Sequence, residues 1–293
     1  MGTSTRRADR AGTLTLGDLT VNRLGFGAMR VTGPYAWGGR RDRAAMYELL
    51  RRAYELGHNF FDTADSYGPD VSENYIADAL YPYPKDLVIG TKGGLVRPSR
   101  HRWDECGDPD HLRQAVDGSL RRLRVAHIHL YQLHAPDPNV PYAESFGALA
   151  ELRRAGKIRH LGVSNVSVRQ LEEARRIAPV VSVQNEYNVG NRASQDVVAA
   201  CEKAGIAFIP WFPLGNGRAL RSKRVAPVAA RLGATPAQVA LAWLLARSPV
   251  MLPIPGTQSI DHLEENAAAA KIRLSPDDLT ALDSKRPSSI GGR

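Results

Sequence analysis

One pattern of apolar and polar positions recurs along the 293-residue chain. An amphipathic helix ends in glycine, a short apolar or β-branched run follows, and a polar loop leads to the next helix. The joins YELG-HNFFDTA, RRAG-KIRHLGVS and EKAG-IAFIPW show it plainly. Gly57, Gly156 and Gly205 stand where a left-handed helix cap is favoured, because glycine adopts that conformation at little cost.

The repeat predicts strands at residues 25–29, 59–64, 87–92, 128–134, 158–164, 180–186, 207–212 and 251–256. Helices are predicted between them, among others at 42–56, 109–123, 143–155, 167–177, 194–204 and 236–247. Strands alternating with helices are typical of a parallel sheet covered on its outside, and eight of them close a (β/α)₈ TIM barrel. An open nucleotide-binding sheet would carry G-x-G-x-x-G after its first strand, but GFGAMR ends in Arg30.

The ends of the chain complete this α/β outline. TLTL, Gly17-Asp18 and LTVNRL predict a β-hairpin before the barrel. Residues 1–12 are expected to be a disordered lead-in, residues 13–286 a single barrel domain, and residues 287–293 a C-terminal tail.

Composition narrows the class of protein. The chain is 43% hydrophobic and 24% charged, as in ordinary globular proteins. Its longest apolar run, VALAWLLA, is far shorter than the roughly 20 residues of a membrane span, and no apolar segment follows the basic N-terminus as in a secretory signal. Cys106 and Cys201 are too few and too far apart for a disulfide framework or a zinc site, which favours a cytoplasmic protein without a metal.

The net charge of +9 raises the question of nucleic acid. The arginines are spread along the chain, beside apolar stripes of predicted helices, and no nucleic-acid-binding motif accompanies them. We therefore expect solvated helix faces and no nucleic-acid or membrane partner. The net positive charge still favours an anionic cofactor or substrate.

Strand alternation selects the candidate site. In a barrel, the chemistry lies at the carboxyl ends of the strands, on side chains that point inward. Four inward series become polar at their last member, which gives Asp62, Lys92, His134 and Gln184. A single polar residue at one strand end could arise by chance, but chance does not readily explain four at equivalent depth on different strands. We therefore expect these four side chains to converge on one pocket.

The stretch FFDTADSYG adds two further polar groups. Asp65 lies in the turn Ala64-Asp65-Ser66, where an aspartate commonly bonds nearby backbone amides, and it is interpreted as a turn-former. Tyr67 is five residues past Asp62, far enough for the loop to fold it over the barrel mouth.

Together these groups indicate proton donation to a developing alkoxide. A phenol has a pKa of about 10, and lowering it by about three units requires roughly 4 kcal/mol, which a desolvated Lys92 within hydrogen-bond reach could supply. Asp62 would keep Lys92 charged, and His134 would donate a hydrogen bond to a carbonyl oxygen. Schiff-base chemistry on Lys92 is the rival, although a paired Asp62 opposes the deprotonated amine that it requires.

These motifs, in this order, resemble the aldo-keto reductase superfamily of NADP(H)-dependent carbonyl reductases, and especially the monomeric bacterial and plant branch that includes pyridoxal reductases. DTADSYG, IGTK, LYQLHAPD, LGVSN and VQNEYN carry the resemblance, which extends from LGFGAM to HLEEN. It implies that Tyr67 is the general acid, Lys92 lowers its pKa, Asp62 pairs with Lys92 and His134 orients the carbonyl.

The resemblance also implies a set of cofactor contacts. The nicotinamide amide would be held by Ser164, Asn165 and Gln184, and Trp211 would stack on the ring where relatives have tyrosine. Further contacts are expected from Gly27, Ala28 and Met29 at the end of the first strand, and along the pyrophosphate from Pro213, Leu214 and Gly215. PIPGTQSIDHLEEN resembles the adenosine end, with Gly256, Thr257, Gln258 and His262 near the 2′-phosphate and Glu265 and Asn266 on the adenine.

Two positions depart from the family pattern. Gln258 stands where lysine or arginine is common, and His262 where many relatives have arginine. Both recognise a phosphate more weakly than arginine does. His262 could equally lie on a solvated face of a helix capped by Ser259. NADP(H) remains the expected cofactor ahead of NAD(H).

The long loops after the first and third strands are expected to set substrate choice, because such loops lie at the catalytic face. Tyr35, Trp37 and Trp103 are the candidate substrate contacts, suited to an aldehyde or ketone with a flat or apolar body; they could equally pin the loops to the barrel. Arg97, Arg100 and Arg102 either recognise an anionic group or are solvated. The function expected is NADPH-dependent carbonyl reduction by a monomer, and the alternative is an NADP(H)-binding regulatory barrel similar to potassium-channel β-subunits.

Overall fold

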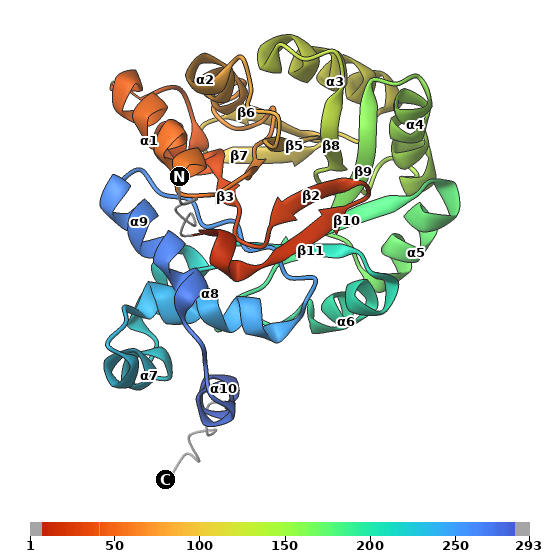
Figure 1. Ribbon diagram of the computed structural model, residues 1–293. Helices are drawn as coiled ribbons and strands as arrows, with labels where there is room; N and C mark the ends of the chain where they lie inside the picture. The colour runs from red at the N-terminus through yellow and green to blue at the C-terminus, as the bar shows by residue number, and fades with distance from the viewer. Residues whose placement is uncertain (1–7, 41, 285–293) are drawn as a thin grey trace, which may run out of the picture.

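The computed structural model describes residues 8–40 and 42–284. A ring of helices surrounds a curled parallel sheet, and an N-terminal hairpin lies across one end of it (Figure 1). This is the α/β arrangement predicted from the alternating pattern.

Seven parallel strands form the main sheet of the described chain, in the order β11-β10-β9-β8-β5-β4-β3. Each predicted strand up to residue 212 corresponds to one of them. Their bounds are β3 (Phe26–Gly27), β4 (Phe60–Asp62), β5 (Val88–Gly93), β8 (Ile128–Leu133), β9 (Ile158–Ser164), β10 (Val180–Glu186) and β11 (Ala207–Trp211).

The eighth predicted strand, residues 251–256, closes the ring without forming a regular ladder. On one side, Phe208 donates to Val250 O and accepts from Leu252 N. On the other, Gly25 N donates to Pro253 O at 2.9 Å, and the amide of Gly27 donates to Pro255 O at 3.3 Å. Proline has no N–H to return a bond, so this segment joins both edges of the sheet through few donors.

The helices cover the outside of the sheet (Figure 1). All six helices named from the sequence are present within a residue or two of their expected bounds, and Gly57, Gly156 and Gly205 all have positive φ. The helices are α1 (Arg43–Glu55), α2 (Val71–Leu80), α3 (Pro109–Leu123), α4 (Tyr142–Arg154), α5 (Val168–Ile177), α6 (Gln195–Ala204), α7 (Val225–Leu232), α8 (Pro236–Arg247), α9 (Ile260–Ala268) and α10 (Pro276–Asp283).

The N-terminal hairpin of β1 (Thr13–Leu16) and β2 (Leu19–Asn22) seals the end of the barrel opposite the strand termini that carry the polar residues. Its Leu16 and Val21 are buried in one cluster with the inward side chains of the strands, Phe60, Val88 and Leu130 among them. An apolar plug of this kind leaves the other end of the barrel as the place for a cavity.

The expected disordered lead-in is wrong for residues 8–12. Ala8–Ala11 form a short 3-10 helix, Ala8 is fully buried, and its amide donates to Leu56 O at 2.9 Å. Apolar contact with Leu24 and Ala270 holds this segment against the barrel. Residues 1–7 and the expected tail at 287–293 lie outside the described residues.

A second hairpin follows β5, where only a loop was predicted. Strands β6 (Leu95–Ser99) and β7 (Arg102–Glu105) pair antiparallel, with an irregular register between Val96 and Ser99. Pro98 lies inside this irregularity and weakens the period-2 signal that would have identified a strand. The hairpin rises from the polar end of the barrel and carries Trp103.

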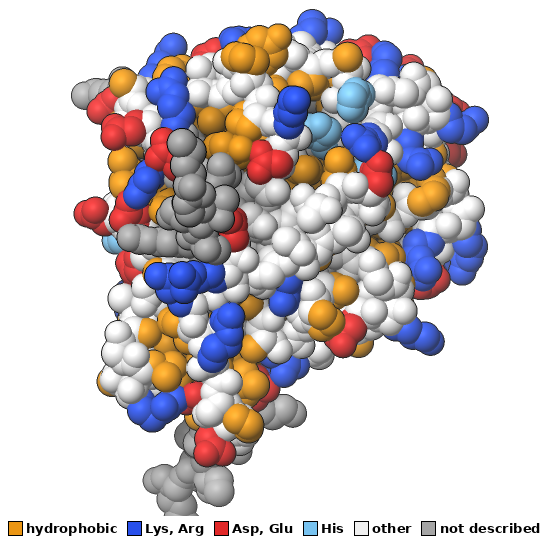
Figure 2. Space-filling view, viewed as in Figure 1, with side chains coloured by type: hydrophobic (Ala, Val, Ile, Leu, Met, Phe, Trp, Pro, Cys, Tyr) orange, Lys and Arg blue, Asp and Glu red, His pale blue; other side chains and the backbone are white. Residues whose placement is uncertain are grey.

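Charged side chains are dispersed over the face that carries the first hairpin. Figure 2 shows lysine and arginine interspersed with acidic and apolar groups on this face, as expected for solvated helix surfaces. Within residues 8–40 and 42–284, no single helix could cross a membrane by length and hydropathy, and α7 with α8 would pass only as a pair bent by 100°.

Candidate active site

A cavity of about 820 Å³ opens at the carboxyl ends of the strands. Asp62, Ser164 and Trp211 end β4, β9 and β11, and their side chains reach it. The expected site residues that line it are Gly27, Met29, Asp62, Tyr67, Trp103, His134, Ser164, Asn165, Gln184, Trp211, Pro213, Leu214, Gly256, Thr257, Gln258 and His262. Lys92 is fully buried behind Tyr67 and Asp62.

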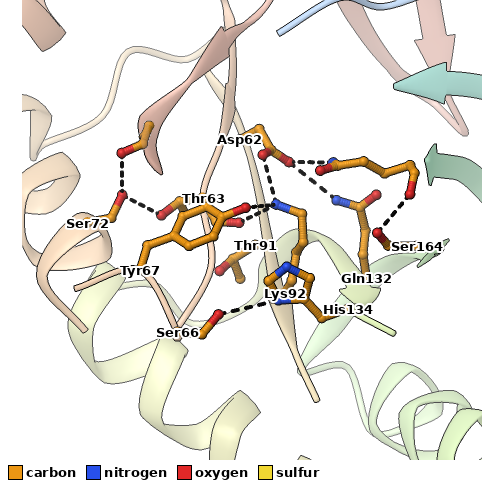
Figure 3. Close-up of polar contacts among 12 residues, drawn as sticks. Asp62, Thr63, Ser66, Tyr67, Ser72, Thr91, Lys92, Gln132, His134 and Ser164 are labelled. Atoms are coloured by element: carbon orange, nitrogen blue, oxygen red, sulfur yellow. Dashed lines mark hydrogen bonds and ion pairs between the residues drawn. The ribbon is translucent and has the colours of Figure 1, made fainter. Parts of the chain in front are cut away.

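The ammonium of Lys92 joins an acid and a phenol. Its Nζ donates to Asp62 Oδ2 at 2.8 Å and to the hydroxyl of Tyr67 at 3.4 Å, and a third bond runs to Thr63 O at 2.8 Å (Figure 3). The three protons of an ammonium are thus all directed to acceptors. Alternation along β4 and β5 brings these side chains together, as the sequence predicted.

Two glutamines complete the surroundings of Asp62. Its Oδ1 accepts from Gln184 Nε2 at 2.8 Å and, more weakly, from Gln132 Nε2 at 3.5 Å. With Lys92 on Oδ2, both carboxylate oxygens of Asp62 have hydrogen-bond donors in a buried site. Gln132 lies in β8 two residues before His134, so strand alternation puts it on the same inward face.

Tyr67 does not have the lowered pKa that the sequence predicted. Burial raises the pKa of its phenol above the ordinary value, and Lys92 opposes this rise without cancelling it. For Lys92, burial acts to lower the pKa, but Asp62 and then Tyr67 outweigh it, so the pKa is raised. The arrangement therefore holds a protonated phenol beside a charged ammonium at neutral pH.

His134 is held as a neutral imidazole. Burial, reinforced by the charge of Lys92, keeps the pKa of His134 well below its ordinary value. Ser66 Oγ lies 3.4 Å from Nδ1, which leaves Nε2 for a group in the cavity (Figure 3). The ring lies edge to face with Tyr67, with centroids 5.8 Å apart. A neutral imidazole in this place can donate a hydrogen bond but carries no surplus proton.

A second wall is built from amides and an indole. Asn165 Nδ2 donates to His134 O at 2.9 Å, and Asn165 Oδ1 accepts from the indole Nε1 of Trp211 at 3.0 Å. Ser164 Oγ donates to Gln184 O at 2.7 Å. Asn165 has a φ of 58°, a left-handed conformation that asparagine tolerates better than most residues. The edge of the Trp211 ring is therefore held by Asn165, which also bonds the backbone of His134.

Two glycines form the floor where the barrel closes. A Cβ on Gly27 would lie 2.6 Å from Ile254 O, and one on Gly256 would lie 2.5 Å from Gly27 O. Both φ values are ordinary, so it is the close crossing of the two backbones that requires glycine. This crossing brings the loop after β3 beside the loop that leads to α9.

Sequence reasoning missed two cations in the cavity. Arg30 and Arg40 lie on the loop after β3, and both line the cavity. The guanidinium of Arg30 donates to Asn216 Oδ1 across the cavity, and its backbone oxygen accepts from Gln258 Nε2 at 2.8 Å. The other lining residues without an expected role are Phe212, Asn216, Gly217, Leu220, Ile254, Pro255 and Ser259.

Six expected residues lie away from this lining. Tyr35 is 64% exposed and packs on His101, and Trp37 packs near Arg97. Glu265 accepts a hydrogen bond from Thr235, at the cap of α8. Ala28, Gly215 and Asn266 are buried next to lining segments.

Asp65 is not the simple turn-former that was predicted. Its Oδ1 is buried without a hydrogen-bond partner among the described residues, and burial, followed by Glu73, raises the pKa of its carboxyl well above the ordinary value. Glu73 is fully buried, accepting from Thr91 Oγ1 and from Arg122 Nε, each at 2.6 Å. Arg122 also pairs with Asp70 at 3.1 Å. This network supports the Tyr67 loop and β5 from outside the barrel.

Comparison with known proteins agrees with the family resemblance of the motifs. The model of the Aldo/keto reductase family matches residues 23–287. The chain belongs to the aldo/keto reductase family. The resemblance inferred from DTADSYG, IGTK and LYQLHAPD is thereby confirmed.

Two curated relatives and one solved structure of the aldo/keto reductase family are close to this chain. An uncharacterized oxidoreductase of Schizosaccharomyces pombe is 50% identical over 98% of this chain and 94% of its own. Pyridoxine 4-dehydrogenase of Escherichia coli is 46% identical over 92% of this chain and 97% of its own. A Klebsiella pneumoniae aldo-keto reductase in complex with NADPH has a TM-score of 0.77 at 26% identity, covering 90% of each chain.

Proposed function

We propose that this aldo/keto reductase reduces an aldehyde or ketone to an alcohol with NADPH, using Tyr67 as the proton donor. The observation that carries the proposal is the position of Lys92 Nζ between Asp62 Oδ2 and the Tyr67 hydroxyl, at the edge of a cavity. A Schiff-base role for Lys92 is disfavoured, because Asp62 and Tyr67 raise its pKa.

The cavity lining suits a nicotinamide dinucleotide. Ser164, Asn165 and Gln184 would hold the nicotinamide amide, and the fixed indole of Trp211 offers its face to the ring. The loop from Pro213 to Gly215 would follow the pyrophosphate, with Gly256 to His262 and then Glu265 and Asn266 at the adenosine end. When bound, NADPH supplies the hydride.

Proton donation falls to Tyr67. His134 Nε2–H would hold the carbonyl oxygen near the Tyr67 hydroxyl, since both side chains line the same cavity. As the carbonyl oxygen becomes an alkoxide, it becomes a far stronger base than a phenolate, so even a phenol with a raised pKa transfers its proton. Lys92 then stabilises the phenolate that remains, in a site of low dielectric where its charge acts strongly.

Arg30 and Arg40 bear on the choice of NADPH. Gln258 and His262 are weak phosphate ligands, but the cavity gains two permanent cations from the loop after β3. The NADPH complex of the Klebsiella pneumoniae relative supports the same choice. We therefore propose NADP(H) as the working cofactor, ahead of NAD(H).

Pyridoxal is our first candidate substrate. The Escherichia coli relative is named for the oxidation of pyridoxine, and the pyridine ring of such a substrate is flat, as expected for a cavity bordered by Trp103. Other aromatic aldehydes and ketones share this shape.

The test has two stages. Quenching of tryptophan fluorescence by NADPH and by NADH measures both dissociation constants, with Trp211→Phe as the reference for the signal. NADPH oxidation at 340 nm is then followed with pyridoxal, 4-nitrobenzaldehyde and a ketone. Turnover of at least one carbonyl, lost in Tyr67→Phe, is the expected result. Tight NADPH binding without turnover of any carbonyl would instead favour a regulatory barrel.

A further inference from the structure

Arg97 is a buried cation beside the catalytic loop. It follows β5 on strand β6 and is only 8% exposed. No carboxylate in residues 8–40 or 42–284 forms an ion pair with it in the structure, and burial lowers the pKa of its guanidinium. The residue is therefore neither a solvated arginine nor an open anion site, the two roles considered from the sequence.

Backbone oxygens take up its donors instead. Nε donates to Arg102 O at 3.1 Å, and Nη2 donates to Arg100 O at 2.8 Å, which fixes the turn of the β6–β7 hairpin. Nη2 also reaches Tyr35 O at 3.1 Å, and Nη1 reaches Ala36 O at 2.9 Å, both on the loop after β3.

The fifth contact lies next to the catalytic tyrosine. Nη1 donates to Ser66 O at 3.4 Å, one residue before Tyr67. One guanidinium thus joins three segments that are adjacent only in the folded chain: the loop after β3, the Tyr67 loop and the β6–β7 hairpin. A planar fork with five donors can do this, whereas a lysine ammonium has three donors and no plane.

The guanidinium lies over two indole rings. Its central carbon lies 3.7 Å from the ring centroid of Trp103 and 5.4 Å from that of Trp37. Trp103 in turn meets the ring of Tyr67 edge to face at 6.3 Å and lines the cavity. Arg97, Trp103 and Tyr67 therefore form a continuous series of contacts from the hairpin to the proposed proton donor.

The hairpin alone would hold Trp103 poorly. Two-stranded hairpins are marginally stable in water, and this one has an irregular register at its turn. Trp103 is also 37% exposed, so packing does not fix it from all sides. The cation–π contact of Arg97 with Trp103 and the hydrogen bonds of Arg97 to the neighbouring loops supply the additional stabilisation that the hairpin needs.

We propose that Arg97 is a positioning residue that fixes the Trp103 indole as a wall of the substrate end of the cavity, and thereby selects carbonyl compounds with a flat ring. This inference rests on the proposed carbonyl reduction. It assigns the selection of aromatic substrates to a side chain that does not itself line the cavity.

The experiment is a double-mutant cycle read on two substrates. Arg97→Met keeps most of the side-chain length without donors, and Trp103→Ala removes the wall. Both variants, their combination and the wild type are assayed for kcat/KM with 4-nitrobenzaldehyde and with propanal. Arg102→Gln is the matched control, because it changes a neighbouring, mostly exposed arginine that pairs with Asp104. Arg97→Lys retains the charge.

The ratio of kcat/KM for 4-nitrobenzaldehyde to that for propanal is expected to fall about tenfold in Arg97→Met, as loss of a desolvated cation–π contact implies. Trp103→Ala should lower the ratio similarly, and the double variant should be no lower than Trp103→Ala alone. Arg97→Lys keeps the charge but loses the planar fork of five donors, so its ratio should also fall below that of the wild type. Arg102→Gln should resemble the wild type. The dissociation constant of NADPH should not change in Arg97→Met.

Three results would overturn the inference: equal losses for both aldehydes in Arg97→Met, fully additive losses in the double variant, or a wild-type ratio in Arg97→Lys. Absence of any turnover by the wild type would refute the proposed function alone. Binding then decides the inference, through tryptophan quenching by 4-nitrobenzaldehyde. Arg97→Met should weaken this binding about tenfold, and unchanged binding would refute the inference.

Discussion

Lys92 Nζ lies 2.8 Å from Asp62 Oδ2, and neither side chain is more than 3% exposed. A buried pair of this kind is costly to break, because the remaining charge has no partner and little water. Here the pair also borders the Tyr67 hydroxyl, so stability and the proposed proton transfer depend on the same contact.

Asp62→Asn should destabilise the fold and impair turnover together. Lys92 would remain buried beside a neutral amide, and the free energy of unfolding should fall by about 3 kcal/mol, as is typical when one partner of a buried pair is removed. Urea denaturation measures this loss. Asp104→Asn, which breaks the exposed pair with Arg102, should cost less than about 1 kcal/mol. Equal costs for the two variants would contradict the role of burial.

Tyr67→Phe should remove the proposed proton donor while leaving cofactor binding intact. General acids contribute roughly 10²- to 10⁴-fold to rate, so kcat for an activated aldehyde should fall by at least about 100-fold. The dissociation constant of NADPH should be unchanged, because the proposed nicotinamide contacts lie on the wall of Ser164, Asn165 and Trp211. A Phe variant that turns over as fast as the wild type would exclude Tyr67 as the acid.

Arg122→Ala should lower stability far more than loss of a neighbouring surface pair. Glu73 would keep its bond from Thr91 but lose its buried cation, at a cost of about 3 to 5 kcal/mol in the free energy of unfolding. Asp78→Asn breaks an exposed pair with Arg124 between the same two helical regions and should cost less than about 1 kcal/mol. Thermal or urea unfolding compares the two.

His58 should make the protein sensitive to acid. Burial lowers the pKa of His58 to about 4 from its ordinary 6.5, although Nδ1 donates to Leu24 O. The unfolded chain therefore binds a proton that the folded one excludes, and stability falls as pH drops from 6.5 towards 4, by roughly 3 kcal/mol in total. In His58→Gln, the free energy of unfolding should fall less between pH 7 and pH 4.5. An unchanged pH slope would show that His58 titrates normally.

His262→Arg should sharpen the preference for NADPH. His262 is an exposed residue of α9 at the rim of the cavity. A permanent guanidinium near the proposed 2′-phosphate should tighten NADPH binding about tenfold, as one charge-assisted hydrogen bond implies. NADH, which lacks that phosphate, is the internal control in the same fluorescence titration. Equal tightening of both would indicate that residue 262 faces the pyrophosphate instead.

Period-2 alternation was the strongest source of correct prediction. It depends only on the local chain, and it placed Asp62, Lys92, His134 and Gln184 on inward faces where the structure brings them together. The glycine caps were predictable for the same reason, since a left-handed cap is a local requirement.

The features that sequence reasoning missed depend on contacts between distant segments. Arg97 is buried because carbonyls from residues 31 and 61 positions earlier in the chain converge on it, and no local pattern records that. Arg30 and Arg40 lie on an irregular loop without periodicity. The raised pKa of Tyr67 reflects how fully the fold excludes water, which the identity of its neighbours did not reveal.

Pro253 and Pro255 weaken the closure of the barrel between β3 and residues 250–255, which we call the seam. Across it, the amides of Gly25 and Gly27 donate to Pro253 O and Pro255 O, but the prolines have no N–H to donate in return. Gly27 and Gly256, on opposite sides of this seam, both line the cavity. A molecule bound in the cavity contacts both sides of this seam, so ligand binding also stabilises the closure of the barrel.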